Sequence, residues 1–86
     1  MRFQGAVIRE QGVSFAIVVV QRRVLTDRRQ SEETAGAFQR FFPGLPIVLM
    51  GQDTGGVPTY YGRHDIVRFM SRVPLSAVPW KEYTFA

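Results

Sequence analysis

The sequence predicts a small mixed α/β domain in which two helices pack on a sheet of about four strands. Residues 13–20 and 46–50 are short runs of β-branched and aliphatic residues, and such runs are typical of strands that are buried on both faces. Apolar residues recur at helical spacing between these runs and again after them. The expected α/β (α+β) fold therefore has the order ββαββα, followed by an irregular aromatic tail, and is arranged in two layers.

The first two strands are predicted to form an antiparallel hairpin. Residues 3–9 alternate loosely between apolar and polar side chains, and Gln11-Gly12 supplies a tight turn before the run at 13–20. Strands this close in sequence usually pair with each other. Because the run at 13–20 is continuous rather than alternating, we expect it to lie in the centre of the sheet.

The segment after the hairpin predicts an amphipathic helix that has two rival starting points. Asp27 and Gln30 have the spacing of a capping box, whereas Ser31 precedes two glutamates that would suit the helix dipole. The apolar face contains Ala35, Phe38 and Phe42. Pro43-Gly44 ends the helix. Residues 46–50 should then run parallel to 13–20 after a right-handed crossover.

A turn, a short edge strand and a second helix are expected next. The turn at 53–56 reverses the chain, and residues 59–62 can form a short antiparallel strand. His64 or Asp65 is expected to cap the helix, whose apolar face contains Ile66, Phe69, Met70 and Val73. Two prolines in the tail argue against a long regular element there, although residues 83–85 could add a short strand.

Size and composition exclude several classes of protein. The chain has 86 residues and no cysteine, so we expect a single domain over residues 1–86 without disulfides, thiolate chemistry or cysteine-bound metal. One histidine and scattered acids offer no metal cluster, and no phosphate-loop or dinucleotide motif is present, so we predict no cofactor. The longest apolar run has six residues, against about 20 for a membrane span. We therefore expect a cytoplasmic protein that does not enter a membrane.

The segment from Tyr60 to Arg68 is the predicted binding site. It combines two tyrosines, the only histidine and two arginines at a helix start, in a set that contains Tyr60, Tyr61, Arg63, His64, Asp65 and Arg68. Neighbouring residues on a strand face opposite ways, so one tyrosine should face solvent. An edge strand with an exposed aromatic residue is a natural docking surface. We expect a binding or interaction module whose partner is an unknown protein or a second copy of the chain.

Two alternatives remain open at the level of sequence. The net charge of +4 and an arginine-rich set of Arg22, Arg23, Arg28 and Arg29 would suit nucleic acid, with exposed aromatic residues to stack on bases. Lys81 is the only lysine among the 11 basic residues, and such a skew can reflect base composition of the genome instead. A small enzyme or enzyme subunit would have to use His64 and Asp65 for acid–base chemistry. No catalytic residue is assigned, since no nucleophile has a visible partner.

Overall fold

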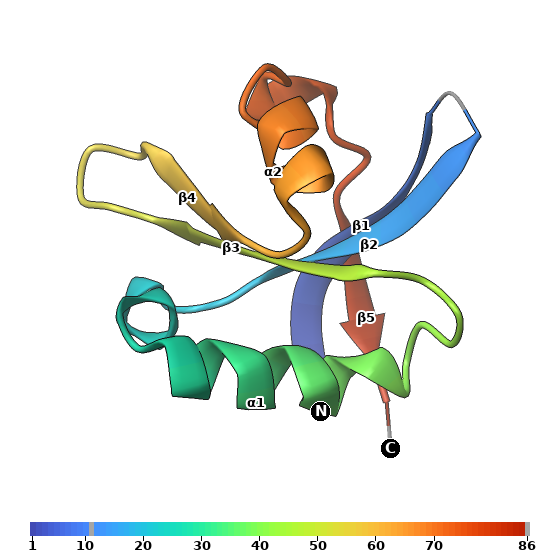
Figure 1. The fold of residues 1–86 in the computed structure, drawn as a ribbon, viewed down its shortest axis with the longest axis horizontal. Coiled ribbons are helices and arrows are strands. Elements are labelled where there is room, and N and C mark those ends of the chain that lie inside the picture. The colour runs from blue at the N-terminus through green and yellow to red at the C-terminus, as the bar shows by residue number, and fades with distance from the viewer. Residues whose placement is uncertain (11, 86) are drawn as a thin grey trace.

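The computed structural model describes residues 1–10 and 12–85, which form one five-stranded mixed sheet with a helix on each side (Figure 1). The strand order across the sheet is β4-β3-β2-β1-β5. The strands are β1 (Arg2–Glu10), β2 (Val13–Val19), β3 (Ile47–Gln52), β4 (Pro58–Tyr61) and β5 (Lys81–Thr84). The helices are α1 (Arg28–Gln39) and α2 (His64–Met70), and the 3₁₀ turns are η1 (Arg22–Thr26) and η2 (Leu75–Ala77).

The predicted strand pairing is confirmed. β1 and β2 form an antiparallel hairpin, and β2 pairs in parallel with β3, with Val18 opposite Leu49. β4 returns antiparallel to β3 and lies at one edge of the sheet. The crossover through α1 is therefore the connection that makes the sheet mixed.

The two helices lie on opposite faces of the sheet, so the domain has three layers and not the two that we expected (Figure 1). The central strands explain the difference. Ile17 and Val48 belong to the core cluster that contains α2 residues, whereas Val18 and Leu49 belong to the cluster under α1. Because consecutive residues of a strand face opposite ways, a strand that is apolar throughout needs cover on both sides.

The C-terminal tail contributes a fifth strand where four were expected. β5 pairs antiparallel with the first half of β1, in a register that places Tyr83 opposite Phe3. The rings of Tyr83 and Phe85 stack on Phe3 at centroid distances of 5.3 and 5.8 Å. Pro79 lies just before this strand, so it breaks no ladder bond. Tyr83 and Phe85 of the tail thus complete the core beneath α1.

The helix starts resolve the rival predictions. Asp27 is the N-cap of α1, and its Oδ1 accepts hydrogen bonds from the backbone N–H groups of Arg29 (2.9 Å) and Gln30 (3.5 Å). Ser31 lies inside the helix and is fully buried, so the rival start was wrong. The predicted cap of α2 was also wrong, because Arg63 occupies that position without a side-chain capping bond.

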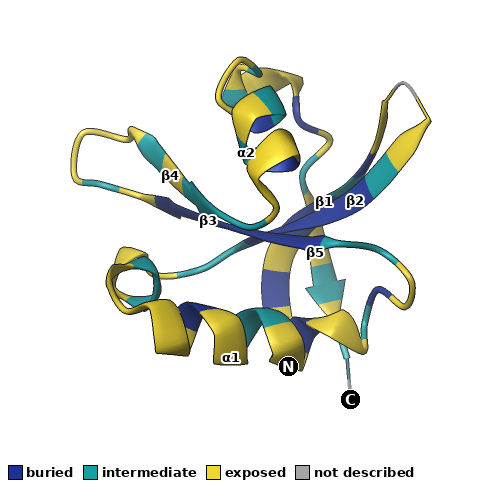
Figure 2. Cartoon of the chain, in the orientation of Figure 1, coloured by how far each residue is buried: buried dark blue, intermediate teal, exposed yellow. Residues whose placement is uncertain are grey.

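Burial follows the layers (Figure 2). The middle of the sheet and the inward faces of both helices are buried, whereas β4 is more exposed, as are the end of β1 and the start of β2. Ile66 and Met70 anchor α2 on the sheet at 2% and 0% exposure. α2 therefore holds its first turn, which carries His64 and Asp65, at a fixed place above the sheet.

Candidate functional site

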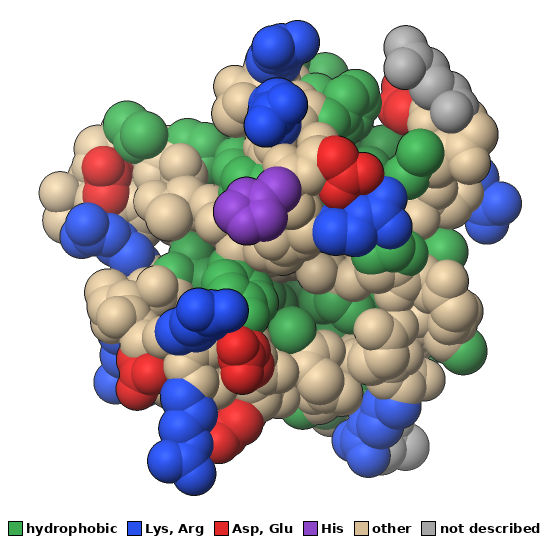
Figure 3. All heavy atoms as spheres, viewed as in Figure 1, with side chains coloured by type: hydrophobic (Ala, Val, Ile, Leu, Met, Phe, Trp, Pro, Cys, Tyr) green, Lys and Arg blue, Asp and Glu red, His purple; other side chains and the backbone are tan. Residues whose placement is uncertain are grey.

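Three of the six predicted site residues, Tyr60, Tyr61 and His64, line a hollow at the edge of the sheet, which we call the edge hollow. β4 supplies two tyrosines, α2 supplies its first turn, and α1 supplies its first residue. The cavity measures about 430 Å³ and is lined by Arg28, Tyr60, Tyr61, Gly62, His64 and Val67. Figure 3 shows the single histidine beside a hydrophobic depression with basic side chains nearby. The fold therefore joins Arg28, from the nucleic-acid set, to the tyrosines and histidine of the predicted site.

The two tyrosines lie on opposite faces of β4, as strand geometry predicts. Tyr60 packs against the core cluster beneath α2, and Tyr61 packs against the cluster beneath α1. Both are half-buried, so neither side chain projects freely into solvent. The Tyr60 hydroxyl is buried and has no hydrogen-bond partner within residues 1–10 and 12–85, and this burial raises the pKa of the phenol. Tyr60 is thus as much a core residue as a binding residue.

Arginine side chains gather near the edge hollow, although two of them are already paired. Arg28 and His64 line the cavity and are both exposed. The Nε of Arg28 donates to Glu32 at 3.3 Å, and that of Arg29 donates to Glu33 at 3.2 Å. The turn η1, which carries Arg22 and Arg23, contacts β3, β4 and α1. Exposed i,i+4 pairs of this kind are weak, so Arg28 remains available to a ligand.

Arg63 and Asp65 form a separate pair. Two guanidinium nitrogens of Arg63, Nε and one Nη, each donate to a different Asp65 carboxylate oxygen at 2.8 Å. This bidentate contact lowers the pKa of Asp65 to about 2. Arg68 is exposed on the last turn of α2 and lines neither of the cavities at the start of that helix.

The arrangement does not assemble a catalytic His–Asp pair among the described residues. His64 lines the edge hollow, whereas Asp65 lines a different cavity on the hairpin side of α2. Among the described residues, the carboxylate of Asp65 bonds to Arg63 and forms no hydrogen bond or ion pair with the His64 side chain. A general base needs a group that orients it and a substrate position within hydrogen-bond reach. The geometry therefore gives the acid–base alternative no support.

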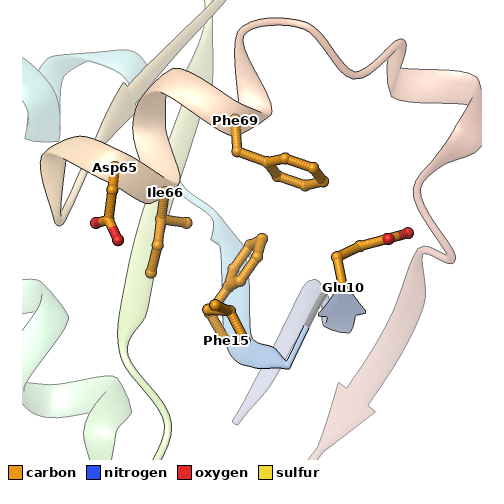
Figure 4. Close-up of a pocket in the computed structure, with 6 residues that line it drawn as sticks. Glu10, Phe15, Asp65, Ile66 and Phe69 are labelled. Atoms are coloured by element: carbon orange, nitrogen blue, oxygen red, sulfur yellow. The ribbon is translucent and has the colours of Figure 1, made fainter.

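A second cavity lies between α2 and the β1–β2 hairpin, and we call it the hairpin hollow (Figure 4). Its volume is about 170 Å³, and its lining is mostly apolar, with Glu10, Val13, Phe15, Asp65, Ile66 and Phe69. The rings of Phe15 and Phe69 are arranged edge to face, with 6.2 Å between their centroids. The sequence analysis missed this cavity, because α2 crosses the hairpin only once the tertiary fold is formed. The one local signal was an acid, Glu10, at the end of an apolar strand.

The described residues contain no cluster of metal-ligating side chains and no membrane-spanning helix. Among residues 1–10 and 12–85, no three histidines or acids come close enough to hold an ion. Within the same residues, no helix is long and apolar enough to cross a bilayer. The polar groups around both hollows instead suit hydrogen bonds and ion pairs with another molecule.

Comparison with protein-family models, with curated proteins and with solved structures finds no match to this chain.

Proposed function

We propose that the protein is a non-catalytic binding module that takes an extended segment of a partner protein along the open edge of β4. One observation carries the proposal: the edge hollow lies at that open edge, and tyrosine, histidine and arginine side chains from three elements converge on it. Tyrosine and arginine are the side chains that protein interfaces favour.

The backbone of β4 supports strand addition. The N–H of Asp53 donates to the carbonyl of Val57 at 3.1 Å, which sets the hydrogen-bonded pairs of the β3–β4 ladder. Such pairs recur at every second residue, so Thr59 and Tyr61 bond to β3 while the N–H and C=O of Tyr60 point outward. Pro58 also points outward, where its missing N–H costs the sheet nothing. A partner strand would find Tyr60 at the centre of its ladder.

The positive charge of Arg28 at the edge hollow favours an acidic partner segment. Arg28 and His64 line the cavity, and no carboxylate does. A glutamate or aspartate beside the added strand would meet Arg28 in place of Glu32, in a charge-assisted hydrogen bond. We therefore expect partner segments to be extended and to carry at least one carboxylate.

Display of random peptides on phage, followed by amide NMR with the selected peptides, tests this proposal. We expect acidic peptides whose binding shifts the amide signals of Tyr60 and Gly62. The double variant R28A/Y61A should weaken binding by about tenfold, on the order of one charged hydrogen bond. The matched control is R29A, which removes an equivalent helix ion pair outside the cavity. Selection of no peptide, or equal loss in R29A, would contradict the proposal.

Nucleic acid is the competing ligand, and the place of η1 against β4 is the observation in its favour. Two of the four arginines in that set already pair with glutamates, which reduces the local positive charge. Fluorescence anisotropy with labelled oligothymidine, measured across a salt series, separates the two ligands. Binding that falls steeply with salt and is lost in R22A/R23A would favour nucleic acid over the partner strand.

A further inference from the structure

The outer half of β1, residues 7–10, has an unpaired edge. β5 covers β1 only as far as the pair of Gly5 with Lys81. At the start of that ladder the N–H of Phe85 donates to the carbonyl of Met1 at 2.8 Å, and the Met1 amine donates back to Phe85. Because hydrogen-bonded pairs recur at every second residue, the N–H and C=O groups of Val7 and Arg9 point to the same side, beyond the end of β5.

The chain before β5 leaves this edge open. Pro79, which would continue the ladder, has no N–H. The backbone N–H groups of Ala77, Val78 and Trp80 bond locally, to the carbonyls of Pro74, Leu75 and Val78 respectively. Among the described residues, this segment therefore donates no backbone hydrogen bond to β1. A cavity of about 230 Å³ lies between residues 7–10, α2 and residues 77–79.

This cavity shares two lining residues, Glu10 and Phe69, with the hairpin hollow. Figure 4 shows Glu10 beside the facing rings of Phe15 and Phe69. Ile8 and Glu10 are two residues apart on β1 and so point to the same face of the sheet, toward α2. An added strand would place two successive same-face side chains there, one near Ile8 and one near Glu10.

The chemistry of these two positions differs. Beside Ile8, the walls are Phe69 and Val73, which suit an apolar side chain. At the second position, the carboxylate of Glu10 points away from the rings of Phe15 and Phe69 (Figure 4). The ion pairs among the described residues do not include Glu10, whereas Asp65 in the same hollow is neutralised by Arg63. A lysine or arginine side chain can lay its aliphatic stem along Phe69 and bring its charge to Glu10.

We propose that residues 7–10 form a second docking edge, which takes an extended peptide with alternating apolar and basic side chains on the face toward α2. The peptide adds to β1 through the backbone groups of Val7 and Arg9, and Glu10 selects its basic residue. This edge is on the opposite side of the sheet order from β4. It does not depend on the function proposed for the edge hollow.

Amide NMR titration of the full chain with a capped peptide of alternating valine, threonine and lysine residues tests the proposal. We expect saturable shifts of the Val7 and Arg9 amides. E10Q should weaken binding about threefold, the scale of one exposed ion pair. R9P removes the outward N–H while sparing the ladder with β2, and it should weaken binding about tenfold.

Two variants on β5 serve as matched controls. E82Q removes the charge of an exposed acid, as E10Q does, and T84P removes an outward N–H, as R9P does. Neither control should change binding. The proposal fails if the peptide causes no saturable shift, or if a version with glutamate in place of lysine binds equally well. It also fails if the Val7 and Arg9 signals shift with protein concentration alone, since a second copy would then be the occupant.

Discussion

At the scale of single residues, two buried hydroxyl groups differ in whether they form a hydrogen bond. The Ser31 hydroxyl lies 2.8 Å from the carbonyl of Val24 and ties η1 to α1. The Tyr60 hydroxyl is buried and has no hydrogen-bond partner among the described residues. A buried polar group without a partner loses its hydrogen bonds to water and gains none in the protein, which destabilises the folded state. The two side chains should therefore respond in opposite ways to loss of the hydroxyl.

Tyr60→Phe should leave the free energy of unfolding unchanged or raise it by about 1 kcal/mol, since it removes an unsatisfied polar atom. Ser31→Ala should lower it by about 1 kcal/mol, because the Val24 carbonyl loses its donor. Urea denaturation of both variants at neutral pH measures the difference. A clear loss of stability in Tyr60→Phe would mean that the hydroxyl has a partner in solution.

The Arg63–Asp65 pair should make stability depend on acid pH. Its hydrogen bonds lower the pKa of Asp65 from 3.8 to about 2. A carboxylate whose pKa is lower in the folded state stabilises that state above the unfolded pKa and loses this contribution as pH falls. The contribution of Asp65 should therefore disappear between about pH 4 and about pH 2.

Urea titrations at a series of pH values, on the wild type and on Arg63→Gln, measure this contribution. The variant should show a shallower fall in stability over the same pH interval, because loss of the Arg63 hydrogen bonds moves the folded-state pKa of Asp65 back toward its usual value. Arg68→Gln, which removes an equal charge on the same helix, is the control. Identical acid profiles for the wild type and Arg63→Gln would show that the pair does not persist in solution.

At the scale of elements, α1 contains a glycine that the fold does not require. Gly36 is exposed in the middle of the helix, and a Cβ added there would meet no atom within 4 Å. Glycine in a helix interior costs about 0.5–1 kcal/mol relative to alanine. Gly51 differs, because a Cβ there would lie 3.0 Å from the backbone of Arg22.

Gly36→Ala should therefore raise the free energy of unfolding by about 0.5–1 kcal/mol. Gly51→Ala, the contrasting variant, should lower it, because β3 and η1 would have to move apart. Thermal unfolding followed by circular dichroism gives both changes. If Gly36→Ala destabilised the protein, the exposed face of α1 would be covered in solution.

The elements were the part of the fold that the sequence could predict. Helical and strand periodicity are local, so they located β2, α1 and β3 and the parallel pairing of the two strands. The continuous apolar pattern of β2 and β3 indicates cover on both faces of the sheet, but it does not indicate which helix covers which face. The sequence allowed a short strand at the position of β5 but did not require one, because its partner, β1, is at the other end of the chain.

The candidate site divides in the same way. Tyr60, Tyr61 and His64 are close in sequence, so their proximity in the edge hollow was predictable. Arg28 joins them only through the crossover and the turn η1. Asp65 was placed with His64 because they are adjacent, yet its carboxylate is held by Arg63 and lines another cavity. Adjacent residues at a helix start diverge by about 100° around the helix axis, and that divergence separates their environments.

At the scale of the whole molecule, one sheet serves two cores. The cluster beneath α1 contains Phe38 and Val18, and the cluster beneath α2 contains Ile17 and is packed by Trp80. Val18 and Ile17 are consecutive residues of β2, so neither core can lose its sheet face without disturbing the other. The domain should therefore unfold in one cooperative step, although its two helices pack on opposite faces of the sheet.

Phe38→Ala tests this coupling across the sheet. Phe38 is 7% exposed and meets Phe3 edge to face at 4.8 Å, so its truncation should cost about 3–5 kcal/mol. Trp80, the only tryptophan, reports from the opposite face. Its fluorescence midpoint in urea should fall as far as the circular dichroism midpoint does. Ala37→Gly, at an exposed position next to Phe38 in α1, provides the control for a helix-only effect of about 1 kcal/mol. If the Trp80 transition kept its wild-type midpoint while the helical signal was lost, the two cores would be independent and β2 would not transmit the loss between them.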